Sequence, residues 1–281
     1  MNLSKPSVVK ELLGRYGLKP SKSLGQNFLV DVHYLSRIVS AADVTQGDTI
    51  VEIGPGLGTL TRALAESGAS VLAIEKDRKL QPVLAETLNG LPVQLITADA
   101  LEVNYLALLQ GATQPKIVAN LPYYITTPLI LGFLQSKVSW RSLVILVQEE
   151  VVRRIMAEPG QKEYGLLGIT VQYFTCPSLI TTIPASAFYP PPQVSSAVFK
   201  LLPKDTSVYG LQVGEEKLFR VVKAALGQRR KTLLNALEAI LGFPRVDLRR
   251  VIADLGWSLD RRGETLSVGE FVALTNQLYV N

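Results

Sequence analysis

The sequence has very few of the residues that form disulfides and metal sites. Its 281 residues include one cysteine, Cys176, and one histidine, His33. A single cysteine cannot form an internal disulfide, and this sparing use of cysteine is typical of a cytoplasmic protein. We expect no metal site, because zinc sites need several histidine or cysteine ligands. A serine triad would have to use His33, which is more simply explained as a surface or helix-facing residue.

Long apolar runs are also missing. No stretch reaches the roughly 20 residues that cross a membrane. The N-terminal residues 1–17 are polar, with Lys and Glu at short intervals, and contain no signal-peptide core. Hydrophobic residues make up 47% of the chain and charged residues 19%, as in globular proteins. These features predict a cytoplasmic protein without a membrane partner, with one large domain and room for a smaller one.

Positive charge is concentrated at the two ends of the chain. Residues 1–22 hold five Lys or Arg and one Glu, and residues 215–281 hold eleven Lys or Arg and eight Asp or Glu. The middle, 23–214, holds thirteen cationic and fifteen acidic residues. A polyanion that touches both ends would explain this distribution. A solvated surface explains an excess of this size equally well.

Apolar strands alternate with helices through the first half of the chain, after expected helices at 6–16 and 32–42. The expected strands are residues 48–54, 70–75, 93–99, 116–122 and 142–148. Strands that are apolar throughout, with helices between them, predict a mostly parallel sheet covered on both faces. The fold class is therefore α/β, with a Rossmann-like order of elements and right-handed crossovers.

The pattern changes after residue 160. Residues 165–174 fit either a helix or a strand, and 178–184 with 196–202 predict a closing strand pair. Helical periodicity then dominates in four segments, 215–228, 229–242, 246–256 and 267–280. We predict a catalytic domain at 1–204 and a small helical domain at 205–281.

A glycine-rich turn, "VEIGPGLGTLT" at 51–61, follows the first of these strands. Gly54, Gly56 and Gly58 permit a tight turn and close approach of a ligand. Thr59 stands where the dinucleotide fingerprint has its last glycine, which disfavours an NAD dehydrogenase. The turn alone is a weak signal, and an ordinary tight turn is the alternative interpretation.

Two acidic residues end the next strands. Glu75 lies 21 residues after Gly54, where a carboxylate accepts hydrogen bonds from a ribose diol. Asp99 ends the third strand and can accept from the amino group of adenine. Because the glycine turn has no Lys or Arg for a phosphate, these residues indicate a nucleoside without phosphates. S-adenosylmethionine is the common ligand of that kind.

The stretch "NLPYYITTPLI" at 120–130 follows the fourth strand. The Asn120 side-chain oxygen and the Leu121 carbonyl can accept from the two N–H bonds of an adenine N6, which frees the nitrogen lone pair for methyl transfer. Pro122 stiffens the turn, and Tyr123 can stack on the base. The alternative is that Asn120 caps a turn and Tyr123 belongs to the core.

Five motifs taken together resemble the small-subunit (16S) ribosomal RNA adenine dimethyltransferases. They are "SLGQNFLVD", "VEIGPGLGTLT", "NLPYYITTPLI", "FYPPPQVSSAVFKL" and "GQRRKTLLNAL". The resemblance spans nearly the whole chain in the expected order. It implies a class I methyltransferase sheet, a helical domain, and dimethylation of N6 on two adjacent adenosines in the hairpin loop near the 3′ end of the RNA. Oligomeric state does not follow from it; we expect a monomer.

The resemblance assigns roles to individual residues. Those implied to contact the cofactor are Asn27, Leu29, Gly54, Glu75, Asp99 and Asn120. Tyr123 and Phe188 would sandwich the flipped adenine, with Asn120 touching both cofactor and base. Those implied to meet RNA phosphates are Arg229, Arg230 and Lys231, although "QRRK" is also a common exposed start of a helix.

Three rival interpretations remain. The large-subunit RNA adenine dimethyltransferases of macrolide resistance share the fold and a similar turn, but lack a run like "QRRKTLLNAL". A DNA adenine methyltransferase usually has proline where Leu121 stands. A non-catalytic nucleic-acid binder with the same fold would not need Glu75, Asp99 and Asn120, which are all present.

Overall fold

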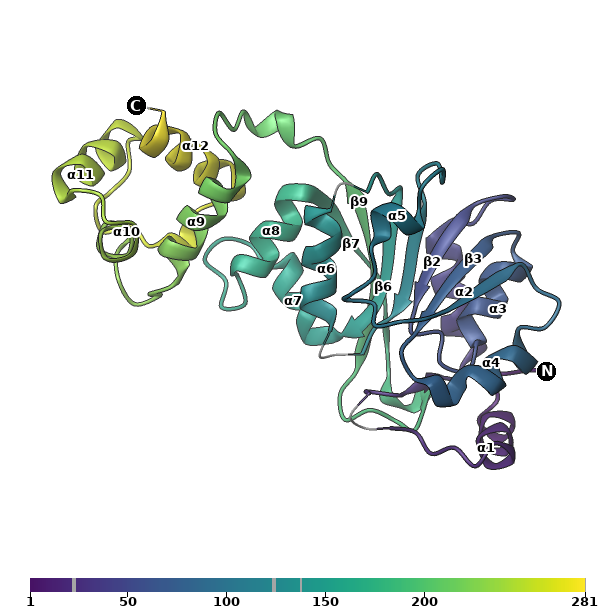
Figure 1. The fold of residues 1–281 in the computed structure, drawn as a ribbon. Helices are drawn as coiled ribbons and strands as arrows, with labels where there is room; N and C mark the ends of the chain where they lie inside the picture. Colours follow the sequence, from purple (N-terminus) through teal and green to yellow (C-terminus); the bar gives the residue numbers. More distant parts are fainter. Residues whose placement is uncertain (22–23, 123–124, 137, 281) are drawn as a thin grey trace. The chain divides into compact units, whose positions relative to one another are not determined.

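The computed structural model describes residues 1–21, 24–122, 125–136 and 138–280 (Figure 1). The chain divides into two compact units. The first comprises Met1–Val152 and Pro177–Pro203, and the second Arg153–Cys176 and Lys204–Asn281. Residues 153–176 therefore group with the C-terminal helices, whereas the sequence-based division at residue 204 leaves them with the strands.

The first unit is built on a seven-stranded sheet with the order β4-β3-β2-β5-β6-β9-β7. The strands are β2 (Thr49–Ile53), β3 (Ser70–Glu75), β4 (Val93–Thr97), β5 (Lys116–Asn120), β6 (Ser142–Gln148), β7 (Thr175–Ile183) and β9 (Ser196–Pro203). Strands β2 to β6 pair in parallel, and β9 is antiparallel to β6. The mostly parallel sheet predicted from the sequence is confirmed, as is the closing strand pair.

The strand order reverses between β2 and β5. From β2 the chain proceeds outward through β3 and β4, whereas β5 lies on the other side and is followed by β6. In open α/β sheets, such a switch point opens a crevice at the carboxyl ends of the strands, where ligands bind. The glycine turn lies here, and the Gly54 amide donates to the Ile74 carbonyl at 3.0 Å.

Helices lie against the sheet of the first unit (Figure 1). They are α1 (Pro6–Arg15), α2 (Val32–Ala42), α3 (Thr59–Glu66), α4 (Gln81–Thr87), α5 (Tyr105–Leu108) and α6 (Thr126–Gln135). Helix α7 (Glu149–Met156) begins in the first unit and ends in the second. Asp31 caps α2 by accepting from the amides of His33 and Tyr34, so the one histidine stands exposed in the first turn. The apolar face of α1, including Leu12, packs with Leu84 of α4.

A short strand pair joins two of the sequence motifs. Strand β1 (Phe28–Leu29) is antiparallel to β8 (Phe188–Tyr189), with Phe28 opposite Tyr189 and Leu29 opposite Phe188. The pair forms a separate two-stranded sheet. It fixes the N-terminal loop to the proline-rich loop, although the two are far apart in the sequence.

The second unit is helical. It contains α8 (Leu166–Phe174), α9 (Glu215–Leu226), α10 (Leu233–Leu241), α11 (Arg245–Asp254) and α12 (Val268–Tyr279) around an apolar core. The ambiguous segment 165–174 is a helix. It is apolar on all sides, so its sequence does not show the helical repeat of polar and apolar residues. Gly168 permits its close packing, since a Cβ there would lie 2.5 Å from the Arg154 carbonyl oxygen. Among the described residues, no helix in either unit is long and apolar enough to cross a membrane.

Candidate active site

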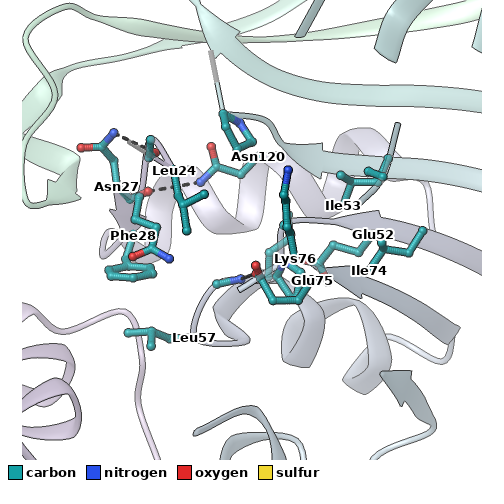
Figure 2. A pocket seen from close by; sticks show the side chains of 18 of the residues that line it. Leu24, Asn27, Phe28, Glu52, Ile53, Leu57, Ile74, Glu75, Lys76 and Asn120 are labelled. Carbon is teal, nitrogen blue, oxygen red and sulfur yellow. Dashed lines mark hydrogen bonds between the residues drawn. The ribbon is translucent and has the colours of Figure 1, made fainter. Parts of the chain in front are cut away.

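A pocket opens at the carboxyl ends of β2, β3 and β5 (Figure 2). It holds about 980 Å³ of space, counting its open mouth. Its walls come from the N-terminal loop, the glycine turn and the strand ends. All six residues assigned to the cofactor line it, namely Asn27, Leu29, Gly54, Glu75, Asp99 and Asn120. The fold thus brings together residues from five separate stretches of sequence.

The glycine turn is shaped for close contact. Gly54 and Gly56 have φ values of 70° and 60°, a region that side-chain-bearing residues rarely adopt. A Cβ on Gly56 would lie 3.1 Å from the Phe28 ring, so the ring rests directly on the turn. The N-terminal loop therefore forms one wall of the pocket, and Phe28 is the residue that brings it close.

Glu75 is a buried carboxylate held by backbone donors. Its side chain lies at the end of β3, and the residue is 8% exposed. Oε1 accepts from the Asp77 amide at 2.8 Å, and Oε2 accepts from the Gly56 amide at 3.4 Å. Burial raises the pKa of Glu75 above its ordinary value, although these hydrogen bonds act in the opposite direction. The backbone bonds orient the carboxylate and leave lone pairs for a ribose diol.

Asp99 is paired with a lysine that the sequence analysis missed. Lys76 Nζ lies 2.6 Å from Asp99 Oδ2, and the Leu101 amide donates to Asp99 Oδ1 at 3.0 Å. The hydrogen bond from Lys76 is the main reason that the pKa of Asp99 is lowered. Lys76 directly follows Glu75 at the end of β3, and its place beside a strand end was the available signal.

Asn120 ends β5 and faces the N-terminal loop. Its Nδ2 donates to the Asn27 carbonyl oxygen at 3.4 Å (Figure 2). Because nitrogen is the donor in this contact, Oδ1 keeps its lone pairs for another donor. Leu121 is buried, and its amide donates to the Leu146 carbonyl at 3.1 Å. The start of the "NLPY" turn is therefore fixed from both sides, by the N-terminal loop and by β6.

Of the two proposed stacking residues, only Phe188 can be located. Tyr123 lies outside the described residues. Phe188 is 4% exposed and packs in an apolar cluster with Ile38 and Leu146. It does not line the pocket, so stacking on a base would require its ring to become accessible. The aromatic sandwich stays a prediction.

The three predicted phosphate contacts differ from one another. Arg229 Nε pairs with Glu264 Oε2 at 2.9 Å, and Nη1 donates to the Lys162 carbonyl at 2.8 Å. Arg230 and Lys231 are exposed, and neither forms an ion pair within the described chain. Helix α10 begins at Leu233, four residues after the expected start, so all three precede it. Arg229 thus fastens the loop to its own unit.

Sequence reasoning also missed two polar residues at the pocket. Glu52 on β2 is 1% exposed, and its Oε2 has no partner among the described residues. Burial, with the charge of Glu75 as a lesser cause, raises its pKa to about 8. Gln26 donates from Nε2 to Asp77 Oδ2 at 2.9 Å, which ties the N-terminal loop to the turn that follows Glu75. A charged residue inside an apolar strand was the signal for Glu52.

Comparison with solved structures defines the class first. A dimethyladenosine transferase from Plasmodium falciparum matches with a TM-score of 0.75 and 24% identity, covering 86% of this chain and 94% of that one. The 23S rRNA methyltransferase ErmE matches with a TM-score of 0.68 and 22% identity, covering 90% and 99%. The predicted class I methyltransferase fold is confirmed.

Sequence comparison then gives the family. The family model described as ribosomal RNA adenine dimethylase matches residues 17–272. Proteins called ribosomal RNA small subunit methyltransferase A are 45% identical in Alkaliphilus oremlandii, over 98% of both chains, and 42% identical in Clostridioides difficile, over 98% of this chain and 96% of that one. The chain belongs to the ribosomal RNA adenine dimethylase family, and the family and enzyme class predicted from its motifs are confirmed.

Proposed function

We propose that this protein uses S-adenosylmethionine to dimethylate N6 of two adjacent adenosines in 16S ribosomal RNA, in the hairpin loop near its 3′ end. The RNA would be presented within the small ribosomal subunit or its precursor. The observation that carries the proposal is the pocket at the switch point, where Glu75, Asp99 and Asn120 meet. The names of the curated relatives support the small-subunit target.

The residues of the pocket fit this cofactor. Glu75 would accept from the ribose diol, and Asp99 from the adenine amino group. The methionine part would lie against Gly54, near the loop that holds Asn27. When bound, the cofactor supplies an electrophilic methyl group on a sulfonium. The glycine turn offers no cation to a phosphate, which favours this ligand over a dinucleotide.

Asn120 and Leu121 would activate the acceptor. The N6 lone pair of adenine is delocalised into the ring, so the amine is a weak nucleophile. Two acceptors on its N–H bonds draw the nitrogen toward tetrahedral geometry, and Asn120 Oδ1 and the Leu121 carbonyl are the groups available. The ammonium product is acidic and loses its proton to water. Most of the rate would come from aligning nitrogen, methyl and sulfur.

The test is to methylate small subunits from a strain that lacks the modification and to map the bases by mass spectrometry. We expect dimethyladenosine at two adjacent positions. Asn120→Ala should lower turnover by on the order of 10²–10³, by analogy with the loss of one oriented polar group in an oxyanion hole. RNA binding should change little. Asn89→Ala, on an exposed asparagine outside the pocket, is the matched control.

Other outcomes would identify the rivals. Modification of large-subunit RNA instead of small-subunit RNA would replace the proposal with the macrolide-resistance activity. RNA binding without binding of S-adenosylmethionine in calorimetry would indicate a non-catalytic relative. Either result would contradict the proposed function.

Tyr123 provides a second test, based on its sequence position. After the first methyl transfer, N6 keeps one hydrogen and can use only one acceptor. Holding the monomethylated base then depends more on stacking. We expect Tyr123→Ala to raise the ratio of monomethyladenosine to dimethyladenosine and to slow the enzyme. A wild-type ratio at normal speed would remove Tyr123 from the site.

A further inference from the structure

The positive charge at residues 1–22 has no role in the function proposed so far. Helix α1 and the following loop carry this charge, and the structure shows which part of it is already used. Arg15 pairs with Glu86 at 2.8 Å and with Glu11 at 3.2 Å. Lys10 and Lys19 are exposed, and no ion pair is found for either one in the described parts of the chain.

Lys10 stands beside the proline-rich loop. Its Nζ lies 5.2 Å from the centre of the Tyr189 ring. Tyr189 follows Phe188 on β8 and pairs with Phe28 of the N-terminal loop. A lysine over an aromatic face is weakly held and keeps its ammonium partly hydrated, so it remains able to meet an anion. This places a cation at the edge of the loop that carries Phe188.

Two more lysines continue from that point. Lys19 and Lys79 line one shallow hollow together with Leu13, which follows Lys10 by one helical turn. Lys79 belongs to the short helix η1 (Arg78–Leu80), shortly after Glu75. Lys79 is exposed and, like the other two, lacks an ion pair within the described residues.

Asp77, the one acid among the described residues that line the hollow, forms no ion pair with these lysines. Asp77 accepts from Gln26 Nε2 at 2.9 Å and from the Lys79 backbone amide at 3.1 Å. Its carboxylate is therefore occupied by a neutral amide and a backbone donor. Of the three leucines that line the hollow, Leu13 and Leu80 are buried and Leu18 is half-buried, so apolar side chains for insertion into lipid are scarce there.

We propose that Lys10, Lys19 and Lys79 form a strip that binds the backbone phosphates of the substrate RNA next to the target base. This inference rests on the proposed function. RNA is the partner that the position favours, because the strip begins beside the loop that carries Phe188 and reaches η1, which follows Glu75 at the edge of the pocket. A single-stranded loop with a flipped base must be held by its backbone, and lysines on flexible stems suit phosphates of variable spacing.

The test compares two charge-matched triple variants. One is Lys10→Gln with Lys19→Gln and Lys79→Gln. The control is Arg37→Gln with Arg141→Gln and Lys200→Gln, which removes three cations that line neither the hollow nor the pocket. Binding to the unmodified 3′-terminal hairpin RNA is measured across salt concentrations. The slope of log affinity against log salt should fall by about 0.7 for each lost contact, hence by ~2 in the first variant and not in the control.

Three further readouts make the result decisive. S-adenosylmethionine affinity and the unfolding midpoint should match wild type, and Lys10→Gln alone should lower the slope by about 0.7 if the triple variant does not fold. An unchanged slope in the folded variant would overturn the strip, even if the wild type methylates normally. Loss of binding to anionic vesicles or heparin with RNA binding intact would overturn it also. A wild type that binds no RNA would remove the proposed function as well.

Discussion

At the amino edge of the sheet, Lys116 begins β5 with its side chain 2% exposed, yet its ammonium is paired. Nζ lies 2.7 Å from Asp48 Oδ2 and also contacts the Asp43 carbonyl. Burial alone would raise the pKa of Asp48, but the bonds from Lys116 and Thr45 hold it below its ordinary value. At the carboxyl edge, Glu52 and Glu75 are also buried, and neither has a cationic partner among the described residues.

Buried charge therefore has a structural role at the amino edge of the sheet and a ligand-binding role at the carboxyl edge. The amino-edge pair is complete within the fold, as a structural ion pair must be. The carboxyl-edge acids have raised pKa values, chiefly because burial disfavours their charged forms. A buried carboxylate without a cationic partner is stabilised when a ligand donates hydrogen bonds to it. The contrast between the unpaired acids at one edge and the ion pair at the other therefore locates the binding site independently of the sequence motifs.

The largest effect should come from breaking the amino-edge pair. Lys116→Met removes the buried cation and leaves the partly buried Asp48 unpaired, and should lower the free energy of unfolding by about 3–5 kcal/mol. Denaturant unfolding measures this. The affinity of the remaining folded protein for S-adenosylmethionine should be unchanged. A loss below about 1 kcal/mol would mean that the pair behaves as a surface ion pair.

At the carboxyl edge, removing a charge should affect cofactor affinity more than unfolding stability. Glu75→Gln takes a charged acceptor from the ribose and should weaken cofactor binding by about 1.5–3 kcal/mol, roughly ten- to a hundredfold. Unfolding stability should change less than cofactor affinity. The variant has no buried charge to desolvate, but its amide nitrogen cannot accept one of the two backbone hydrogen bonds that the carboxylate accepts. Calorimetry and denaturation give the two numbers.

Glu102→Gln is the control for this experiment, since Glu102 is exposed and lies outside the pocket. It should change neither quantity. A Glu75→Gln variant with wild-type cofactor affinity would remove Glu75 from the binding site. A large loss of stability would show instead that its backbone hydrogen bonds support the fold.

Much of this architecture follows from the sequence, and the reasons are physical. Strands β3 and β6 have the predicted bounds, Ser70–Glu75 and Ser142–Gln148, because each is a continuous apolar run. The β1–β8 pair escaped prediction, since two-residue strands carry no period and their partners are far apart in the chain. The burial of Phe188 follows from that pairing and was therefore not predicted either.

Pairings between side chains were hidden for the same reason. Because Glu75 and Asn120 end their strands and Asp99 closely follows β4, the sequence alone indicates that all three share one pocket. The pairing of Lys76 with Asp99, in contrast, cannot be predicted without knowing that β3 and β4 lie side by side. Local spacing predicts where a residue lies on its element, and the partner it meets depends on tertiary packing.

The effect at Glu52 should appear as a dependence of stability on pH. Its pKa is about 8 when folded, against an ordinary value of 4.5. Between these values the folded protein holds a proton that the unfolded chain has lost, so stability falls as pH rises, by up to about 1.4 kcal/mol per pH unit, until the folded carboxyl ionises. Glu52→Gln should lack this slope. Unfolding free energies of both proteins at several pH values between 5 and 9 give the difference, and a constant difference would show that Glu52 is ionised in the fold.

The smallest effects should separate a paired from an unpaired cation in the second unit. Arg229 is bound to Glu264 and to the Lys162 carbonyl, so Arg229→Ala should lower unfolding stability by up to about 1 kcal/mol. Arg230 has no such partner in the described residues, so Arg230→Ala should leave stability unchanged and reduce the salt slope of RNA binding by about 0.7. If Arg229→Ala lowers the slope equally without loss of stability, the Glu264 pair opens when RNA binds, and Arg229 meets phosphate as its motif predicts. If neither variant changes the slope, the "QRRK" loop lies outside the RNA interface, and the contact must be sought elsewhere on the protein.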